Sequence, residues 1–409
     1  MTQVILDISR LISRVRYSTP SGVDRVEMAY ARGLLGIYGE DLAFAAVHPT
    51  GVYGRLTRSA ALAYLDELEQ RWSHQDDNPR QRSLPSVLPW LARLLPTGRG
   101  VGSATGAVYL QVSPHHLINT DKVRTILWRE QARFMVMVHD LIPIEFPEYA
   151  RSSGAEQHRR RMKTVAELAD AVIVNSAATG ASLTRWIETE GNGMAPPPIH
   201  VASLGTERLA PAAPELSPDG RPYFLCLGTI EPRKNHLLLL HLWRHLAETM
   251  PASEVPRLVI VGRRGWENEQ VVDLLERCPA LEGHVEEINN CPDARLSALL
   301  RGARALVMPS FAEGYGMPVA EALSVGTPAL CSDLDALREV GGEIPEFLDP
   351  LDGPGWQAAV LAYAQQGPRY CAQVARLPHW QNPSWDDHMT IVARAVGDLQ
   401  QPKRLRPIS

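Results

Sequence analysis

Short apolar runs alternate with longer helical patterns along the first half of this 409-residue chain. The apolar runs have the length and the Val, Ile and Leu content of buried strands. They are QVILDIS, LAFAAVH, AVYLQVS, RFMVMVH, AVIVNS and IHVASLG. Apolar residues at helical spacing fall between these runs, at 22–35, 155–169 and 178–188. Strands that alternate with helices predict a parallel sheet with helices on both faces.

The second half repeats this alternation. Its predicted strands are YFLCLGT, RLVIVG, HVEEIN, ALVMPS and PALCSD, and its predicted helices include 234–249, 269–277 and 293–302. The stretch TERLAPAAPELSPDGRP, at 206–222, separates the two halves and is rich in proline, alanine and charged residues. Such a composition without periodicity is typical of a linker.

The chain is therefore predicted to be an α/β protein with two doubly wound, Rossmann-like domains. We expect the first domain at 1–205, a linker at 206–221, the second domain at 222–380 and, at 381–409, a helix that packs back on the first domain. Ligands of doubly wound sheets bind beyond the carboxyl ends of the strands. The two domains are accordingly expected to face each other across a cleft that holds the ligand.

The composition narrows the class of protein. A hydrophobic content of 45%, a charged content of 21% and a net charge of −5 are typical of a globular protein with no nucleic acid partner. The five cysteines form no C-x-x-C pair, which favours a reducing compartment. No apolar run is long enough to span a membrane, and the start MTQVILDISR has the pattern of a strand, not of a signal peptide. We expect a cytoplasmic protein.

The stretch PSFAEGYGMPVAEALSVGTPALCSD, at 309–333, carries the first candidate site. Glu313 lies on the turn after a predicted strand, and a helix is expected to begin near Pro318. Gly314 and Gly316 let the backbone approach a ligand, and the N–H groups at the helix start suit a phosphate. Carboxylates repel a phosphate, so Glu313 and Glu321, expected in the first turn of the helix, would accept hydrogen bonds from hydroxyl groups. Phosphate and hydroxyls together indicate a nucleotide sugar.

A pair of cations marks the start of the second domain. In LCLGTIEPRKNHLLLL, Arg233 and Lys234 stand where a helix is expected to begin. Cations are disfavoured near the positive end of a helix. A bound anion such as a pyrophosphate would offset that cost, although a solvated surface pair is the alternative.

Together, GTIEPRKN and PSFAEGYGMPVAEALSVGTP resemble the nucleotide-sugar-binding half of family-4 glycosyltransferases, over about 222–350. These are retaining enzymes with the GT-B fold of two Rossmann-like domains. The resemblance implies that Arg233 and Lys234 hold the donor diphosphate. It implies that Glu313 contacts the hydroxyls of the reacting sugar, and that Glu321 accepts hydrogen bonds from the ribose. The residues expected around the sugar and phosphate are Gly314, Tyr315, Gly316 and Met317.

The role of Glu321 has an alternative, and one further arginine is a candidate. Glu321 near a helix start would also serve as a cap that complements the helix dipole. In VGRRGWEN, Arg263 follows a predicted strand and is a candidate for binding the donor phosphates or base. The alternative for Arg263 is an exposed loop position.

The first domain has two candidate positions. In STPSGVDRVEMAY, Gly22 would let a helix start approach the diphosphate, as in similar transferases; the alternative is a helix entry capped by Ser21. In FMVMVHDLIPIEFPEY, a strand ends in His139 and Asp140, and HDLIP resembles bacterial mannosyl- and related sugar transferases. We expect His139 to bond the donor sugar or the reacting oxygens, and Asp140 to orient it or contact the acceptor. A purely structural histidine is the alternative.

No metal is expected. Asp333 in DLD follows a strand and is predicted to cap a helix and not to bind a metal, and no His, Cys and Asp cluster has ligand spacing. Positive side chains and helix dipoles would then stabilise the leaving diphosphate. Ser176, at another strand end, is predicted to cap the next helix, with acceptor contact as the alternative.

The resemblance implies a retaining hexosyltransferase that uses a nucleoside diphosphate sugar. The donor expected first is GDP-mannose, because EPRKN and HDLIP look like mannosyltransferase sequences; UDP-sugars, GDP-fucose and dTDP-sugars remain open. The expected acceptor is a glycan or lipid-linked glycan in bacterial surface-polysaccharide synthesis, such as lipopolysaccharide or capsule. The alternatives are a nucleotide-sugar epimerase of the same fold and a non-catalytic sugar-nucleotide-binding subunit.

The stretch RQRSLPSVLPWLARLLPTGRG, at 80–100, contains an apolar stripe flanked by arginines. The stripe consists of Trp90, Leu91, Leu94 and Leu95. One interpretation is a helix that packs into the first domain or lines the acceptor side of the cleft. The other is peripheral docking on the cytoplasmic face of the inner membrane, since Trp suits the headgroup region and Arg suits anionic lipid.

Overall fold

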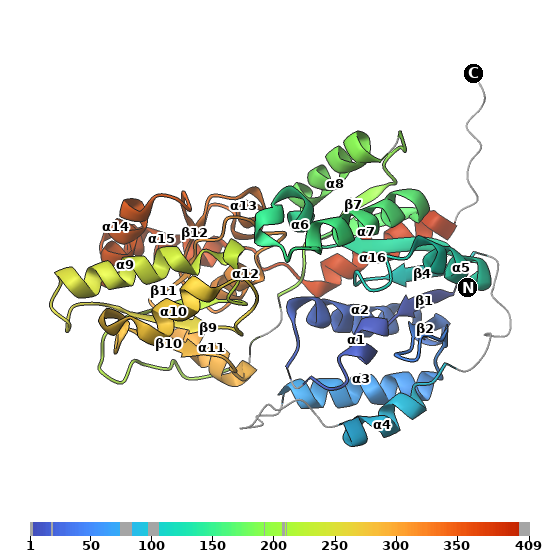
Figure 1. Cartoon of the computed structure of the whole chain (residues 1–409), viewed down its shortest axis with the longest axis horizontal. Helices are drawn as coiled ribbons and strands as arrows, with labels where there is room; N and C mark the ends of the chain where they lie inside the picture. Colours follow the sequence, from blue (N-terminus) through green and yellow to red (C-terminus); the bar gives the residue numbers. More distant parts are fainter. Residues whose placement is uncertain are drawn as a thin grey trace. The chain divides into compact units, whose positions relative to one another are not determined.

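A computed structural model describes residues 3–17, 19–73, 84–96, 106–191, 193–206, 209 and 211–400. The chain divides into two compact units, which are described separately (Figure 1). The first unit comprises Met1–Ile144, Ala155–Leu204 and Ser384–Ser409, and the second comprises Glu145–Gly154 and Gly205–Pro383. The segment Glu145–Gly154, which the sequence suggested for the first domain, thus belongs to the second unit.

Within the described residues, seven strands form the sheet of the first unit, in the order β3-β2-β1-β4-β5-β6-β7. The strands are Val4–Asp7 (β1), Leu42–Val47 (β2), Tyr53–Arg55 (β3), Val108–Gln111 (β4), Arg133–Val138 (β5), Ala171–Val174 (β6) and Ile199–Val201 (β7). Neighbouring strands run parallel, apart from the antiparallel edge pair of β2 and β3. The short β3 was not predicted, because its three residues carry no periodicity of their own.

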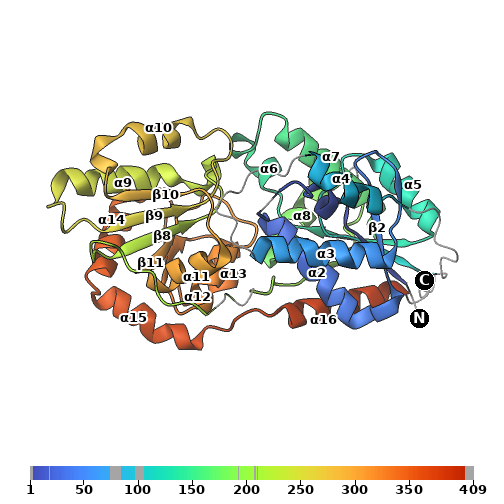
Figure 2. The same ribbon diagram turned by 90° about the horizontal axis from the view of Figure 1, so that it is seen from below.

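Helices cover both faces of this sheet. They are Ser9–Ser13 (α1), Gly22–Tyr38 (α2), Arg58–Ser73 (α3), Leu84–Arg93 (α4), Thr120–Glu130 (α5), Ile142–Glu145 (α6), Gly154–Leu168 (α7), Ala177–Glu190 (α8) and Trp385–Gln400 (α16). Figure 2 shows α5 and α7 on one side of the sheet and α2 and α16 on the other. In α16, His388 bonds the Ser203 carbonyl (3.0 Å) and the Tyr30 hydroxyl (2.7 Å), which fixes this last helix to the first unit.

The described part of the second unit contains a six-stranded parallel sheet in the order β10-β9-β8-β11-β12-β13. The strands are Tyr223–Leu227 (β8), Arg257–Val261 (β9), Val285–Ile288 (β10), Ala305–Met308 (β11), Ala329–Ser332 (β12) and Glu346–Leu348 (β13). The direction of strand addition reverses between β8 and β11. At such a switch point the two following loops leave in opposite directions, and a crevice opens beyond the carboxyl ends of the strands.

Helices again lie on both faces. They are His236–Thr249 (α9), Glu269–Arg277 (α10), Asp293–Gly302 (α11), Met317–Ser324 (α12), Asp335–Gly341 (α13), Gly353–Ala364 (α14) and Pro368–Arg376 (α15). Figure 2 shows α9 and α10 on one face and α11, α12 and α13 on the other. Phe224, Trp243, Trp356 and Tyr363 are buried together in the core between the sheet, α9 and α14. This core holds the loops after β8 and β11 in place.

Candidate active site

The loops after β8 and β11 meet at the switch point of the second unit. The Phe311 N–H donates to the Arg233 carbonyl (2.8 Å), and Arg233 Nη1 donates back to the Ala312 carbonyl (2.9 Å). The first loop ends in a 3₁₀ turn at Pro232–Lys234. The two candidate stretches, which lie far apart along the chain, are therefore joined at the carboxyl ends of the central strands β8 and β11.

A largely buried cluster of charges lies at this junction. The Glu313 carboxylate accepts from Arg233 Nη1 (2.8 Å) and from Lys234 Nζ (2.6 Å), with its side chain only 6% exposed. Arg233 Nε also contacts Glu231 Oε1 (2.6 Å). Burial tends to raise the pKa of Glu313, but the two adjacent cations outweigh it and lower that pKa to about 2. Glu313 is thus held ionised.

The sequence argument for an anionic ligand beside Arg233 and Lys234 needs revision in one respect. The regular helix α9 starts only at His236, after Asn235 in a left-handed conformation (φ 55°). Glu231 and Glu313 already neutralise the two cations. Their position is therefore explained without a bound anion, and the diphosphate role remains a prediction.

Gly316 shapes the glycine-containing turn. Its φ of 109° lies in the left-handed region, and a Cβ there would collide with the Leu337 side chain. Gly316 is the N-cap of α12, which starts at Met317 and has no side-chain cap. Pro318 is therefore the second helical residue, and Glu321 lies beyond the first turn. The expected first-turn position of Glu321 is wrong, and its alternative role as a helix cap loses its basis.

Three other predicted donor-site residues lie around this turn or near it. Gly314 is partly buried and Tyr315 is buried, with a pKa that burial raises. Arg263 follows β9 with an exposed side chain. Its carbonyl accepts from the Ile230 N–H (2.9 Å), which links its loop to the loop after β8.

In the first unit, Gly22 is the first residue of α2, and Ser21 is the N-cap. The Ser21 hydroxyl accepts from the Asp24 N–H (3.4 Å), and Asp24 accepts from the Ser21 N–H (2.7 Å). The capping alternative for this motif is confirmed. Contact of Gly22 with a diphosphate stays a prediction.

His139 and Asp140 directly follow β5, where the sequence placed them. His139 Nε2 bonds the Val112 carbonyl (2.8 Å), so in the neutral ring Nε2 carries the hydrogen and Nδ1 is the acceptor. Burial lowers the pKa of His139, which favours the neutral form. Asp140 Oδ1 accepts from the Ile142 N–H at the start of α6 (3.2 Å), which gives this carboxylate a local structural role.

Two further predictions concern helix caps. Ser176 is the N-cap of α8 and accepts from the Thr179 N–H (3.1 Å), as predicted. The cap predicted at Asp333 is wrong, because Leu334 takes the N-cap position of α13. Asp333 instead pairs with Arg338 through both carboxylate oxygens (2.5 and 2.9 Å).

Sequence reasoning missed Glu231, although it stands in the same EPRKN motif as its partner Arg233. A carboxylate two residues before the candidate Arg233 was the available signal. Over the described part of the chain, no group of three or more His, Cys, Asp and Glu side chains could hold a metal ion. None of the described helices is long and apolar enough to cross a membrane.

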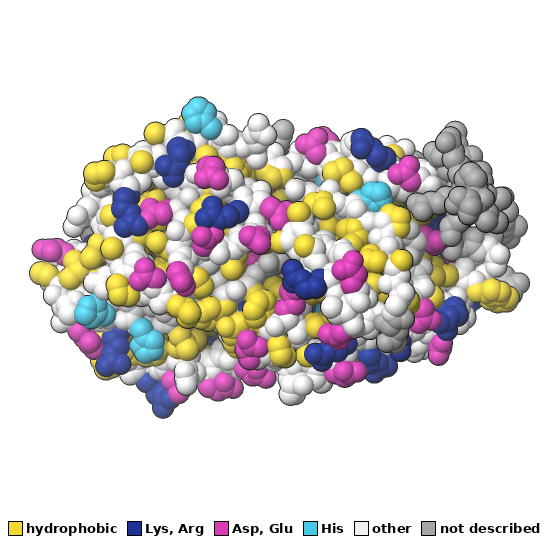
Figure 3. All heavy atoms as spheres, turned by 90° about the horizontal axis from the view of Figure 1, so that it is seen from above, with side chains coloured by type: hydrophobic (Ala, Val, Ile, Leu, Met, Phe, Trp, Pro, Cys, Tyr) yellow, Lys and Arg dark blue, Asp and Glu magenta, His cyan; other side chains and the backbone are white. Residues whose placement is uncertain are grey.

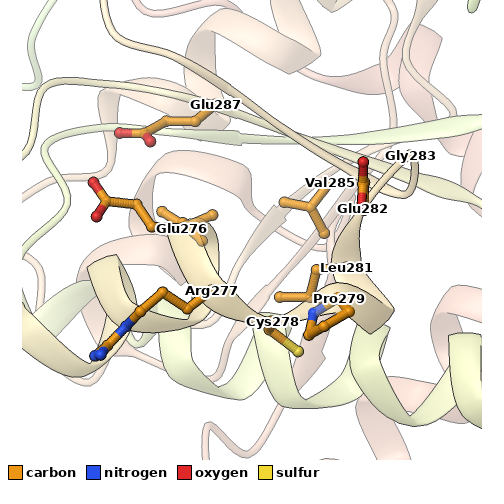
Figure 4. Close-up of a pocket in the computed structure, with 10 residues that line it drawn as sticks. Glu276, Arg277, Cys278, Pro279, Leu281, Glu282, Gly283, Val285 and Glu287 are labelled. Atoms are coloured by element: carbon orange, nitrogen blue, oxygen red, sulfur yellow. The ribbon is translucent and has the colours of Figure 1, made fainter.

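A surface pocket of about 490 Å³ lies away from this site. Figure 4 shows Glu276 and Glu287 on one side of it and Leu281 and Val285 on the other. Val285 begins β10, so most of the pocket lies toward the amino ends of the strands. Doubly wound sheets bind ligands at the opposite, carboxyl ends. On the face drawn in Figure 3, acidic and basic side chains are interspersed.

Residues 211–343 match the family described as glycosyl transferases group 1. The chain is 36% identical to the O-antigen chain mannosyltransferase B of Escherichia coli over 169 residues, which are 41% of this chain and 44% of that protein. It is 32% identical to the O-antigen chain mannosyltransferase RfbU of Salmonella typhimurium over 142 residues, 34% of this chain and 37% of that protein. The matches thus span less than half the length of each of these relatives.

Solved structures resemble nearly the whole chain. Sucrose-phosphate synthase from Thermosynechococcus elongatus has a TM-score of 0.63 at 16% identity and covers 98% of this chain and 99% of its own. Anabaena HepE in complex with UDP and glucose has a TM-score of 0.59 at 15% identity, with coverage of 98% and 99%. The chain, with one sheet in each unit, thus has the two-sheet architecture of GT-B proteins. The chain accordingly has the GT-B fold, and its residues 211–343 resemble the group 1 glycosyltransferases.

Proposed function

We propose that this protein is a retaining glycosyltransferase that moves a sugar from a nucleoside diphosphate to a glycan or lipid-linked glycan. One observation carries the proposal: Arg233, Lys234 and Glu313 form a largely buried cluster at the β8–β11 switch point, inside the segment that matches the group 1 family. Basic side chains that can bind a phosphate thus lie beside a carboxylate that can accept hydrogen bonds from hydroxyls. They lie at the position where a doubly wound sheet binds its ligand.

The donor is proposed to bind to the second unit at the carboxyl ends of β8 and β11. Arg233 and Lys234 would contact the diphosphate, while Glu313 and Glu321 would accept hydrogen bonds from sugar and ribose hydroxyls. The uncapped start of α12, at Met317, would add its positive dipole end. These groups would stabilise the negative charge that develops on the leaving diphosphate without a metal ion. Arg263 is a further candidate for the phosphates or base.

The sugar is proposed to be mannose from GDP-mannose. The support is that two relatives with at least 30% identity are named O-antigen chain mannosyltransferases. The same names support an acceptor in bacterial surface-polysaccharide synthesis. His139 is proposed to contact the reacting sugar through Nδ1, with Asp140 orienting its loop and Gly22 approaching the diphosphate.

A lipid-linked acceptor would bring the protein to the cytoplasmic face of the inner membrane, and α4 is our candidate for peripheral contact. The structure shows part of its apolar stripe packed inside the first unit: Leu94 is 0% exposed, and the Trp90 ring lies against the Tyr64 ring, tilted by 56° with 5.5 Å between the ring centroids. Leu88 and Leu95 are 56% and 47% exposed. Among the described residues of this segment, these two leucines are the exposed large apolar side chains that could contact a membrane.

The α4 proposal is tested by co-sedimentation with phosphatidylglycerol vesicles. A Leu88→Glu, Leu95→Glu double variant should lose the binding that the wild type shows. The control Leu216→Glu changes a leucine that is 76% exposed in the second unit and should bind as the wild type does. Equal binding by all three proteins, or by none, would contradict the proposal.

The donor proposal is tested by a thermal-shift panel of nucleoside diphosphates. A ligand at about 100 times its dissociation constant adds roughly 2.7 kcal/mol of stability, so the preferred base is directly visible. GDP should raise the melting temperature more than UDP, dTDP or ADP. A panel in which no nucleoside diphosphate stabilises the protein would reject the donor site.

A further inference from the structure

A second cavity lies beside the charged cluster and has a volume of about 360 Å³. The loop after β8, the starts of α9 and α10, Phe311 and Tyr149 line it. Tyr149 comes from the segment Glu145–Gly154 of the second unit. A volume of this size is within the range of small-molecule sites.

His236 is the unusual polar group in this cavity. It is 1% exposed, and neither ring nitrogen has a hydrogen-bond partner in the structure. Burial, helped by the nearby Lys234 charge, lowers the pKa of His236 to about 4, so the ring is neutral near pH 7. A neutral imidazole offers one N–H donor and one acceptor nitrogen. Buried polar groups normally have partners, and ligand hydroxyls can supply both kinds.

The other walls limit the chemistry of the ligand further. Phe311 and Tyr149 are stacked at 5.4 Å with an angle of 8° between their planes, and the Trp266 indole N–H donates to the Tyr149 carbonyl (3.2 Å). Glu231, Glu267 and Glu269 are the acidic residues of the lining, and the described residues that line the cavity include no Lys or Arg. An anion is disfavoured in such a setting, whereas a neutral ring with both apolar and hydroxylated surfaces fits it.

We propose that this cavity binds a neutral sugar unit of a glycan, with ligand hydroxyls bonded to His236 and to the carboxylates of Glu231 and Glu267. The aromatic pair Tyr149 and Phe311 provides the apolar wall. This proposal rests on the proposed function in one respect: the bound glycan is taken to be the acceptor of the sugar. It is separate from the diphosphate contacts of Arg233 and Lys234, although Glu231 adjoins both.

The experiment measures binding of α-mannotriose to the full chain by saturation-transfer NMR and calorimetry. Two variants test the cavity. Gln270→Trp adds bulk at its exposed rim, and His236→Phe keeps an aromatic ring but removes both ring nitrogens. Glu254→Trp, an exposed position elsewhere in the same unit, is the matched control. Each protein is also titrated with GDP, and its melting temperature is recorded.

The wild type and Glu254→Trp should bind α-mannotriose, and the two cavity variants should bind it at least tenfold more weakly with GDP affinity changed less than twofold. If His236→Phe does not fold, the binding of α-mannotriose by Gln270→Trp alone tests the proposal. The inference is overturned if the wild type does not bind the trisaccharide, if Gln270→Trp binds it equally well, or if guanosine displaces it. Failure of GDP to bind any of the proteins would instead count against the proposed donor site alone.

Discussion

At the scale of single residues, Lys234 carries the strongest prediction about donor binding. A charge-assisted hydrogen bond contributes about 1.5–3 kcal/mol, so Lys234→Ala should raise the dissociation constant of GDP at least tenfold. The matched control is Arg244→Ala, which removes an exposed cation of α9 that pairs with Glu248 at 2.9 Å. Calorimetric titration with GDP checks both variants. If a folded Lys234→Ala protein binds GDP as tightly as the control does, Lys234 is not a diphosphate ligand.

Glu313 should make the stability of the fold depend on acid pH. Its pKa is about 2 in the folded protein and about 4.5 without the fold, so its contribution is complete above pH 4.5 and is lost as the pH falls toward 2. The difference corresponds to about 3 kcal/mol. Glu313→Gln should be markedly less stable than the wild type at pH 7, because Arg233 and Lys234 lose a buried counter-ion.

Melting temperatures at pH 7, 5, 4 and 3 test this prediction. The gap between the wild type and Glu313→Gln should narrow below pH 4.5. A gap that stays constant from pH 7 to pH 3 would show that the ion pairs of Glu313 contribute little to stability.

For His139, two substitutions separate chemistry from structure. His139→Gln can keep a donor toward the Val112 carbonyl, whereas His139→Ala removes both ring nitrogens. If Nδ1 contacts the reacting sugar, both variants should lower kcat by about 10²-fold or more with GDP affinity nearly unchanged. Steady-state kinetics and melting temperatures provide the comparison. Recovery of kcat in His139→Gln would show that the histidine is structural.

At the scale of elements, the turn into α12 depends on Gly316. Gly316→Ala forces a side chain into the left-handed region and against Leu337, at a cost of about 1–3 kcal/mol. Gly326→Ala is the matched control, because it has a φ of 81° but open space around it. Gly316→Ala should lower the melting temperature more than Gly326→Ala and should alone weaken GDP binding. Equal effects of the two substitutions would mean that close packing at Gly316 has no role in the site.

The strands and helices that the sequence predicted correctly are those with a strong local pattern. The run RFMVMVH became β5 and ALVMPS became β11, since buried parallel strands need continuous apolar residues. The start of α12 was displaced by one residue because the positive φ of Gly316 makes that glycine the N-cap. Asp333 was misassigned because its competing partner, Arg338, lies five residues away and is not visible in a capping pattern.

At the scale of the whole molecule, the two doubly wound sheets followed from the alternation of strands and helices, and the GT-B fold was implied by the family resemblance. The membership of Glu145–Gly154 in the second unit did not follow from either. It depends on the contacts of Tyr149 with Phe311 and with Trp266, each of which lies more than a hundred residues from Tyr149 along the chain and follows no local rule. The same holds for the cavity around His236, whose lining comes from separate loops. Long-range packing of this kind could not be predicted from one sequence.

The central claim, sugar transfer with retention from GDP-mannose, is tested most directly by NMR of the product. The protein is incubated with GDP-α-mannose labelled with ¹³C in the sugar and with α-mannoside acceptors, and the anomeric signal of the product is followed together with GDP release. We predict a new α-mannosidic signal that forms only when acceptor is present and at the rate of GDP release. A β-linked product would contradict retention, and release of free sugar without any glycosidic product, with or without acceptor, would contradict transfer itself.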